Sequence, residues 1–111
     1  MTTYTPDSWV PVLINSKEHG KIYKVLASWY GGFAGADTWK LSSGIESISV
    51  SEDGTVITMP QSSGSTYVVG RRTHMSSLMH SVFTDFEHKS RDSGLFTITV
   101  IPVSELLEAF K

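Results

Sequence analysis

Apolar and polar side chains alternate most regularly between residues 21 and 30. From residue 23 to residue 29 every second position is apolar: Tyr23, Val25, Ala27 and Trp29. A period of two places these four side chains on one face of a β-strand, with Lys24 and Ser28 on the other. The spacing therefore predicts a strand over 21–30 with one buried face.

The chain up to residue 70 contains further short β-rich runs separated by turn residues. They cover residues 9–14, 38–42, 46–50, 55–59 and 65–69. Asp53-Gly54 between two of these runs is a strong hairpin signal, because both residue types tolerate positive φ. Pro11 cannot donate a main-chain hydrogen bond, which predicts that the first run lies at a sheet edge. The pattern as a whole predicts a meander of antiparallel strands.

The hydrophobic period changes to that of a helix after residue 73. Apolar residues then follow at helical spacing: Met75, Leu78, Met79, Val82, Phe83 and Phe86. Such a series forms one continuous stripe on an α-helix. Thr73 is a suitable N-cap and Gly94 is suited to the position just past the C-terminus. We therefore expect an amphipathic helix over about 74–92.

The last segment returns to strand periodicity before a second helix. Three apolar residues alternate with threonines: Phe96, Ile98 and Val100. They predict a return strand over 95–101 that ends at Pro102, followed by a short helix capped by Ser104. The length fits a single domain, 1–111. The elements together predict an α+β fold in which an antiparallel β-meander packs against one long amphipathic α-helix, with a return strand and a short C-terminal helix.

Composition and charge narrow the classes of function. Hydrophobic residues make up 40% of the chain, which is sufficient for an ordered core. The absence of cysteine excludes disulfides, thiolate metal sites and a cysteine nucleophile, and makes the cytoplasm the expected location. A net charge of −2 argues against binding to duplex nucleic acid. No signal peptide or membrane-length apolar run is present in the sequence, so we expect no membrane insertion.

One candidate site is basic. Arg71, Arg72, Thr73 and His74 directly precede the expected long helix. Two guanidinium groups, an imidazole and unpaired helix amides together favour a phosphate or carboxylate, so the sequence indicates an anion-binding site. The alternative is that both arginines pair with surface carboxylates such as Glu46 or Asp85.

Metal and catalytic motifs are missing from the sequence. The four histidines lack the spacing of known metal motifs: His19, His74, His80 and His88. No G-x-S-x-G nucleophile elbow occurs, and the carboxylates are dispersed along the chain. We therefore expect no catalytic residues, no bound metal and no cofactor, which favours a non-enzymatic protein.

A second candidate site is aromatic. It comprises Tyr30, Gly31, Gly32, Phe33 and Trp39, in and beside a glycine-rich connection. This connection lacks the lysine and hydroxyl residue of a phosphate-binding loop, which favours a turn or bulge. Tyr30 should face away from Trp29, so exposed aromatic side chains beside the glycines would favour a protein interface. The alternative is a second small core beneath the loop.

Three stretches carry a resemblance to known proteins. They are Thr5-Pro6-Asp7-Ser8-Trp9-Val10, the run from Lys24 to Gly32 and the run from Trp39 to Ile45. These stretches, within roughly the first 45 residues, resemble short, uncharacterised proteins encoded by tailed bacteriophages. The resemblance implies a small protein of the host cytoplasm that binds a host or phage protein.

The sequence leaves two other functions open. One is a small-molecule binder that sequesters an anionic, nucleotide-like ligand through Arg71 and Arg72. The other is a virion or assembly component that self-associates into a homo-oligomer through the edge strand containing Pro11.

Overall fold

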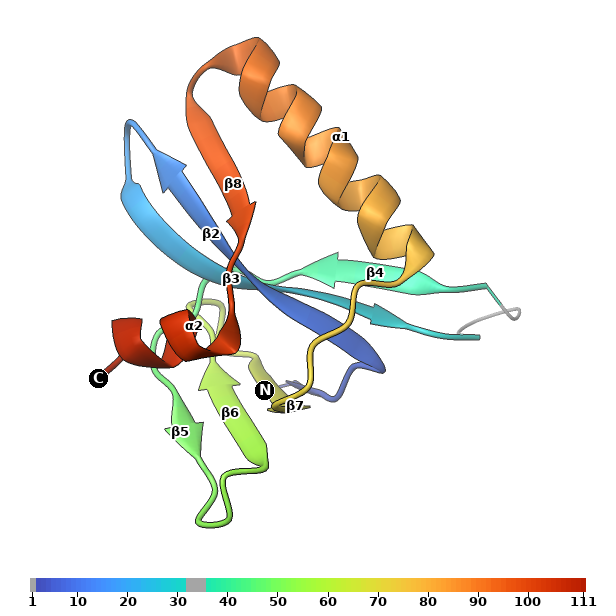
Figure 1. The fold of residues 1–111 in the computed structure, drawn as a ribbon, viewed down its shortest axis with the longest axis vertical. Coiled ribbons are helices and arrows are strands. Elements are labelled where there is room, and N and C mark those ends of the chain that lie inside the picture. The colour runs from blue at the N-terminus through green and yellow to red at the C-terminus, as the bar shows by residue number, and fades with distance from the viewer. Residues whose placement is uncertain (1, 32–35) are drawn as a thin grey trace.

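The fold comes from a computed structural model that describes residues 2–31 and 36–111. It is an α+β fold with two β-sheets and two helices (Figure 1). The strands are β1 (Thr3–Tyr4), β2 (Ser8–Ser16), β3 (Gly20–Trp29), β4 (Thr38–Leu41), β5 (Ser49–Val50), β6 (Val56–Pro60), β7 (Thr66–Gly70) and β8 (Phe96–Val100). The helices are α1 (Ser77–Ser93) and α2 (Val103–Ala109).

The strands divide between two four-stranded sheets instead of forming one meander. The larger sheet has the order β4-β3-β2-β8 and is antiparallel throughout. The smaller sheet has the order β1-β7-β6-β5, and its β1–β7 pairing is parallel. The chain leaves the larger sheet after β4 at Gly44, whose φ of 150° is accessible to glycine and strained for other residues. Ile45 then forms a bridge with Gln61 and starts the path into the smaller sheet.

The prediction that Pro11 marks a sheet edge is wrong, because β2 lies between β3 and β8. The strand tolerates proline there for a local reason. Both backbone groups of its β3 neighbour Val25 bond to Ser42 on the β4 side, so Pro11 directs its own backbone groups toward β8. β8 has ended by that point, and only the Pro11 carbonyl is used, by the amide of Ile101. The missing amide hydrogen therefore interrupts no strand pairing.

The larger sheet is the middle layer of the molecule, with α1 over one face and the smaller sheet with α2 against the other (Figure 1). Alternate side chains along each of its strands point to opposite faces of the sheet, as the sequence predicts for β3. Val10, Val12 and Leu26 pack toward Met79 and Val82 of α1. The opposite face contributes to a core shared with the smaller sheet and α2: Trp9, Val25, Ala27, Ile57, Met59, Tyr67 and Leu106.

The long helix begins three residues later than predicted. Its N-cap is Ser76, whose hydroxyl accepts a hydrogen bond from the Met79 amide, and Thr73 lies upstream in an extended connection. Trp9 holds this connection, because its indole donates to the Gly70 carbonyl and its own carbonyl accepts from the His74 amide. At the other end Gly94, with φ 65°, ends α1 as the sequence predicts.

The second helix also begins differently from the prediction. Pro102 occupies the N-cap position of α2 without a side-chain bond, and Ser104 lies inside the helix. Pro102 is compatible with this position, because the extended N-cap backbone, with φ −67° and ψ 152°, matches the fixed φ of proline, and proline has no amide hydrogen to satisfy.

Candidate functional site

The basic candidate site lies exposed on the connection between β7 and α1 and comprises Arg71, Arg72, Thr73 and His74. The Arg71 guanidinium donates to the Gly54 carbonyl at 3.3 Å, and the His74 amide is engaged by Trp9. Ser76 separates all four residues from the start of α1 and caps one of its free amides. The group therefore precedes the cap of α1, and Ser76 instead of Thr73 binds one of the helix amides on which the anion-site prediction depended. Within 2–31 and 36–111, neither arginine forms an ion pair with Glu46 or Asp85.

The structure describes only part of the aromatic group. Gly32 and Phe33, two of the predicted interface residues, lie outside the described residues. Tyr30 is half-exposed, its hydroxyl bonds to that of Ser8, and its amide donates to an Asp7 carboxylate oxygen at 2.8 Å. The Gly31 amide donates to Asp37 at 3.0 Å. These bonds fix the backbone on both sides of the glycine-rich connection.

Trp39 projects from β4 on the α1 side of the larger sheet. It shares that face with Leu41, as the sequence predicts, and it is 43% exposed. Its indole meets the ring of Phe86 edge-on, with ring centroids 6.0 Å apart. This contact places Trp39 at one end of a larger apolar surface.

That surface contains an apolar groove of about 290 Å³. Six apolar side chains from five elements line it: Ile14 (β2), Ile22 (β3), Leu41 (β4), Phe86 (α1), Phe96 (β8) and Ile98 (β8). The groove arises because α1 covers its face of the sheet incompletely. Met79 and Val82 are buried, whereas Phe86 one turn later and Ile14 and Ile22 near the β2–β3 turn are only half-buried.

The border of the groove is basic. Lys24 and His19 line it from the β2–β3 hairpin, and Lys89 lies with its amine 5.8 Å from the centre of the Phe86 ring. Lys24 is half-buried on the α1 side of β3, opposite Val12. No carboxylate of the described residues forms an ion pair with either lysine. The Glu18 carboxylate lies 3.8 Å from the His19 imidazole at this border. The groove therefore presents apolar side chains beside two lysines that form no ion pair among the described residues.

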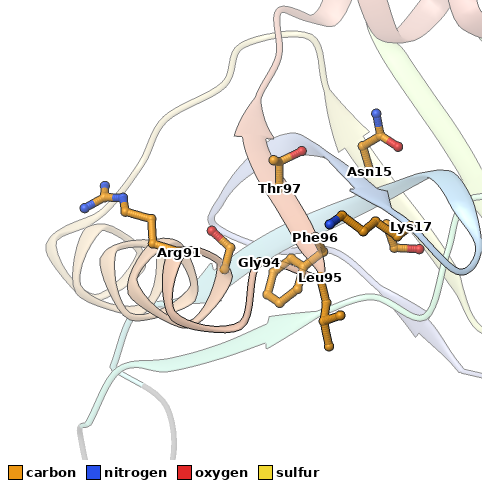
Figure 2. Close-up of a pocket in the computed structure, with 9 residues that line it drawn as sticks. Asn15, Lys17, Arg91, Gly94, Leu95, Phe96 and Thr97 are labelled. Atoms are coloured by element: carbon orange, nitrogen blue, oxygen red, sulfur yellow. The ribbon is translucent and has the colours of Figure 1, made fainter.

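A second hollow, of about 380 Å³, lies where the end of α1 meets the start of β8 and the end of β2 (Figure 2). Lys17 extends toward Leu95 and Phe96, whereas the Arg91 guanidinium points away from them (Figure 2). The two cations therefore do not converge on one point. The carbonyl end of a helix also disfavours an anion there, so this hollow lacks the features of an anion site.

Among residues 2–31 and 36–111, two groups have shifted pKa values, and both lie outside the groove. Burial, with a smaller contribution from Tyr4, raises the pKa of Tyr67 to about 12. Its buried hydroxyl has no hydrogen-bond partner among the described residues. The hydrogen bonds from Ser51 and Thr55 lower the pKa of Asp53 to about 2 at the exposed β5–β6 turn. Both shifts have structural causes, and neither group lies at the groove.

The histidines and carboxylates do not gather into a metal site in the described part of the chain. Among residues 2–31 and 36–111, no three metal-ligating side chains of the His, Cys, Asp and Glu types converge on a point. Over the same residues, neither helix is long and apolar enough to cross a membrane.

Comparison with known proteins identifies no relative. No protein-family model matches the chain. Neither the curated proteins nor the solved structures contain a significant match. The site's own chemistry therefore carries the functional argument.

Sequence patterns alone do not reveal this groove. The sequence places Trp39 and Leu41 on one face and Phe86 on the apolar stripe of the helix, and both assignments are confirmed. The groove also needs Ile14, Ile22 and the β8 residues beside them, which depends on strand order. The only sequence signal for it is Lys24, a charged residue on an otherwise apolar-facing stretch of β3.

Proposed function

We propose that this chain is a non-enzymatic binding protein whose apolar groove accepts apolar side chains of a partner protein. The observation that carries the proposal is the groove of about 290 Å³ itself, with Lys24, Lys89 and His19 at its border. Concave apolar surfaces bordered by polar groups are typical of recognition sites. The basic border favours a partner segment in which carboxylates flank the apolar side chains.

Trp39 supports a protein partner over a small apolar molecule. It extends the apolar surface beyond the groove, and tryptophan is prominent among residues that dominate the energetics of protein interfaces. A small molecule held in the groove would leave this ring in water. A peptide that crosses from the groove onto β4 would cover it.

The proposal about which organism supplies the partner protein depends on the resemblance of the N-terminal stretches to phage proteins. We propose a host or phage protein in the host cytoplasm, as that resemblance implies. Sequestration of an anionic nucleotide-like ligand is the weaker candidate, because Ser76 caps an α1 amide and the His74 amide donates to the Trp9 carbonyl, which leaves fewer free amides for an anion.

A peptide selection tests the proposed groove. The purified chain would be used to select binders from a randomised peptide library. We expect enriched peptides to combine apolar residues with flanking Asp or Glu, and Lys24→Glu to weaken their binding about tenfold or more. A tenfold loss corresponds to about 1.4 kcal/mol, the scale expected when a favourable charge contact becomes repulsive.

Lys21→Glu is the matched control. Lys21 lies on the same strand, but its side chain is on the face opposite Lys24 and borders hollows beside α2. It makes the same change in net charge without altering the groove. Peptides that bind Lys24→Glu as tightly as wild type, or that are weakened equally by both variants, would refute the groove as the binding site.

A further inference from the structure

The outer edge of β8 presents backbone groups that the groove does not use, although Phe96 and Ile98 of the same strand line the groove. β8 is the last strand of the larger sheet, with β2 on one side and no strand on the other among the described residues (Figure 1). Hydrogen bonds from Lys17 to Leu95 and from Ile101 to Pro11 fix which backbone groups face β2. By the alternation of antiparallel pairs, the amides and carbonyls of Phe96, Ile98 and Val100 point outward.

The sequence of this edge strand lacks the residue types that usually prevent edge-to-edge pairing. Natural edge strands carry charged residues, proline or bulges. The sequence of β8 is Phe-Thr-Ile-Thr-Val, with no charge, proline or glycine. The outward amides and carbonyls make no hydrogen bond to any described residue. Val100 is 37% exposed, so the apolar side of the strand is also accessible near its end.

The strand is also self-complementary. In an antiparallel pair centred on Ile98, Phe96 of one copy lies opposite Val100 of the other, and Ile98 lies opposite Ile98. Thr97 of one copy then lies opposite Thr99 of the other. Apolar side chains meet on the α1 side of the sheet and threonines meet on the other side. Both kinds of cross-strand pair are favourable.

The backbone geometry matches the same register. The outward-facing residues are Phe96, Ile98 and Val100, which this register pairs only with one another. Each of those pairs can exchange two main-chain hydrogen bonds, while the threonine pairs fall at the close, non-hydrogen-bonded positions. We propose that the partner of this edge is a second copy of the chain, joined through β8 about a twofold axis at Ile98. The two larger sheets then form one continuous antiparallel sheet.

Cysteine pairing tests the register directly, because the natural chain has no cysteine. Thr97 and Thr99 are exposed, and non-hydrogen-bonded partners lie about 4.5 Å apart between Cα atoms, within reach of a disulfide. A mixture of the Thr97→Cys and Thr99→Cys proteins should form a cross-linked dimer under mild oxidation. Each variant alone should cross-link several-fold less, since its cysteine lies opposite a threonine.

Sedimentation of the uncross-linked chain supplies the second measurement. Wild type should change from monomer to dimer as its concentration rises, and Val100→Lys should weaken this association at least tenfold. Val50→Lys is the matched control, because Val50 is 41% exposed on β5, at the edge of the smaller sheet. A monomer at all concentrations, equal weakening by both lysine variants, or cross-linking of Thr97→Cys alone as strong as in the mixture would overturn the proposal.

Discussion

Two buried serine hydroxyls set the position of α1 on the sheet. Ser28 of β3 and Ser76 share a hydrogen bond of 3.0 Å, and Ser76 also accepts from the Met79 amide. A buried hydroxyl without a partner is costly, so the pair constrains both where the helix begins and where it rests. The sequence pattern predicts Thr73 as the cap, whereas the structure uses Ser76. The choice between them depends on Ser28, 48 residues away in the chain.

The cap assignment predicts unequal effects of two similar substitutions. Ser76→Ala should lower the free energy of unfolding by about 1–2 kcal/mol, because it removes the cap and leaves the Ser28 hydroxyl unpartnered. Thr73→Ala should change it by less than about 0.5 kcal/mol, because Thr73 is exposed upstream of the helix. Urea denaturation measures both values. A larger loss for Thr73→Ala would contradict the cap assignment.

Tyr67 gives a prediction about pH. Its folded pKa of about 12 exceeds the unaltered value of 10.0, so the folded state retains the proton more strongly. The contribution of Tyr67 protonation to the free energy of unfolding is fully present below about pH 10 and is lost as pH rises toward 12. Tyr67→Phe removes the titrating group and an unpartnered buried hydroxyl.

At neutral pH we expect the free energy of unfolding of Tyr67→Phe to equal that of wild type or to exceed it by up to about 1 kcal/mol. The variant should therefore unfold at an equal or higher temperature. Its stability should also decline less between pH 10 and 12. Thermal denaturation across that range makes the comparison. A large loss at neutral pH would show that the hydroxyl has a stabilising partner.

At the scale of elements, local patterns predict strand and helix type well and strand neighbours poorly. Alternation identifies β3 and β8, and the apolar stripe identifies most of α1. The prediction that Pro11 marks a sheet edge is wrong because a strand inside a sheet tolerates proline at any position where the missing amide hydrogen would not point to a neighbouring strand. That condition depends on where β8 ends, which the residues around Pro11 do not encode. The second sheet is missed for a similar reason, since its parallel β1–β7 pair joins segments distant in sequence.

The end of α1 is the boundary most firmly determined by local chemistry. Gly94→Ala should cost about 1 kcal/mol or slightly more, because its φ of 65° lies in the left-handed region that Cβ disfavours. Gly70→Ala is the control, since Gly70 has no positive φ and an added Cβ would lie at an ordinary 3.9 Å from the Thr55 carbonyl. Chemical denaturation should show a loss for the first variant and little change or a small gain for the second. Equal losses would argue against the left-handed cap.

At the scale of the whole molecule, the layered fold creates the candidate site. The larger sheet must bury both faces, and α1 covers its face only from the N-terminal turns to about Phe86. The uncovered remainder is the groove, bordered by Lys24 of the central layer. The sequence predicts Trp39 as an interface residue, and the structure places it beside Phe86 at the groove's end. The groove itself emerges only from the convergence of five elements.

The most direct test of the groove as a binding site is the footprint of a selected acidic, apolar peptide on the chain, measured by amide and methyl NMR shifts during titration. We predict that the largest shifts map to groove residues such as Ile22, Leu41 and Phe86, extend to Trp39, and disappear in Lys24→Glu. Shifts concentrated at Arg71–His74 or on the smaller sheet, with the groove unchanged, would contradict the proposal that the groove is the binding site.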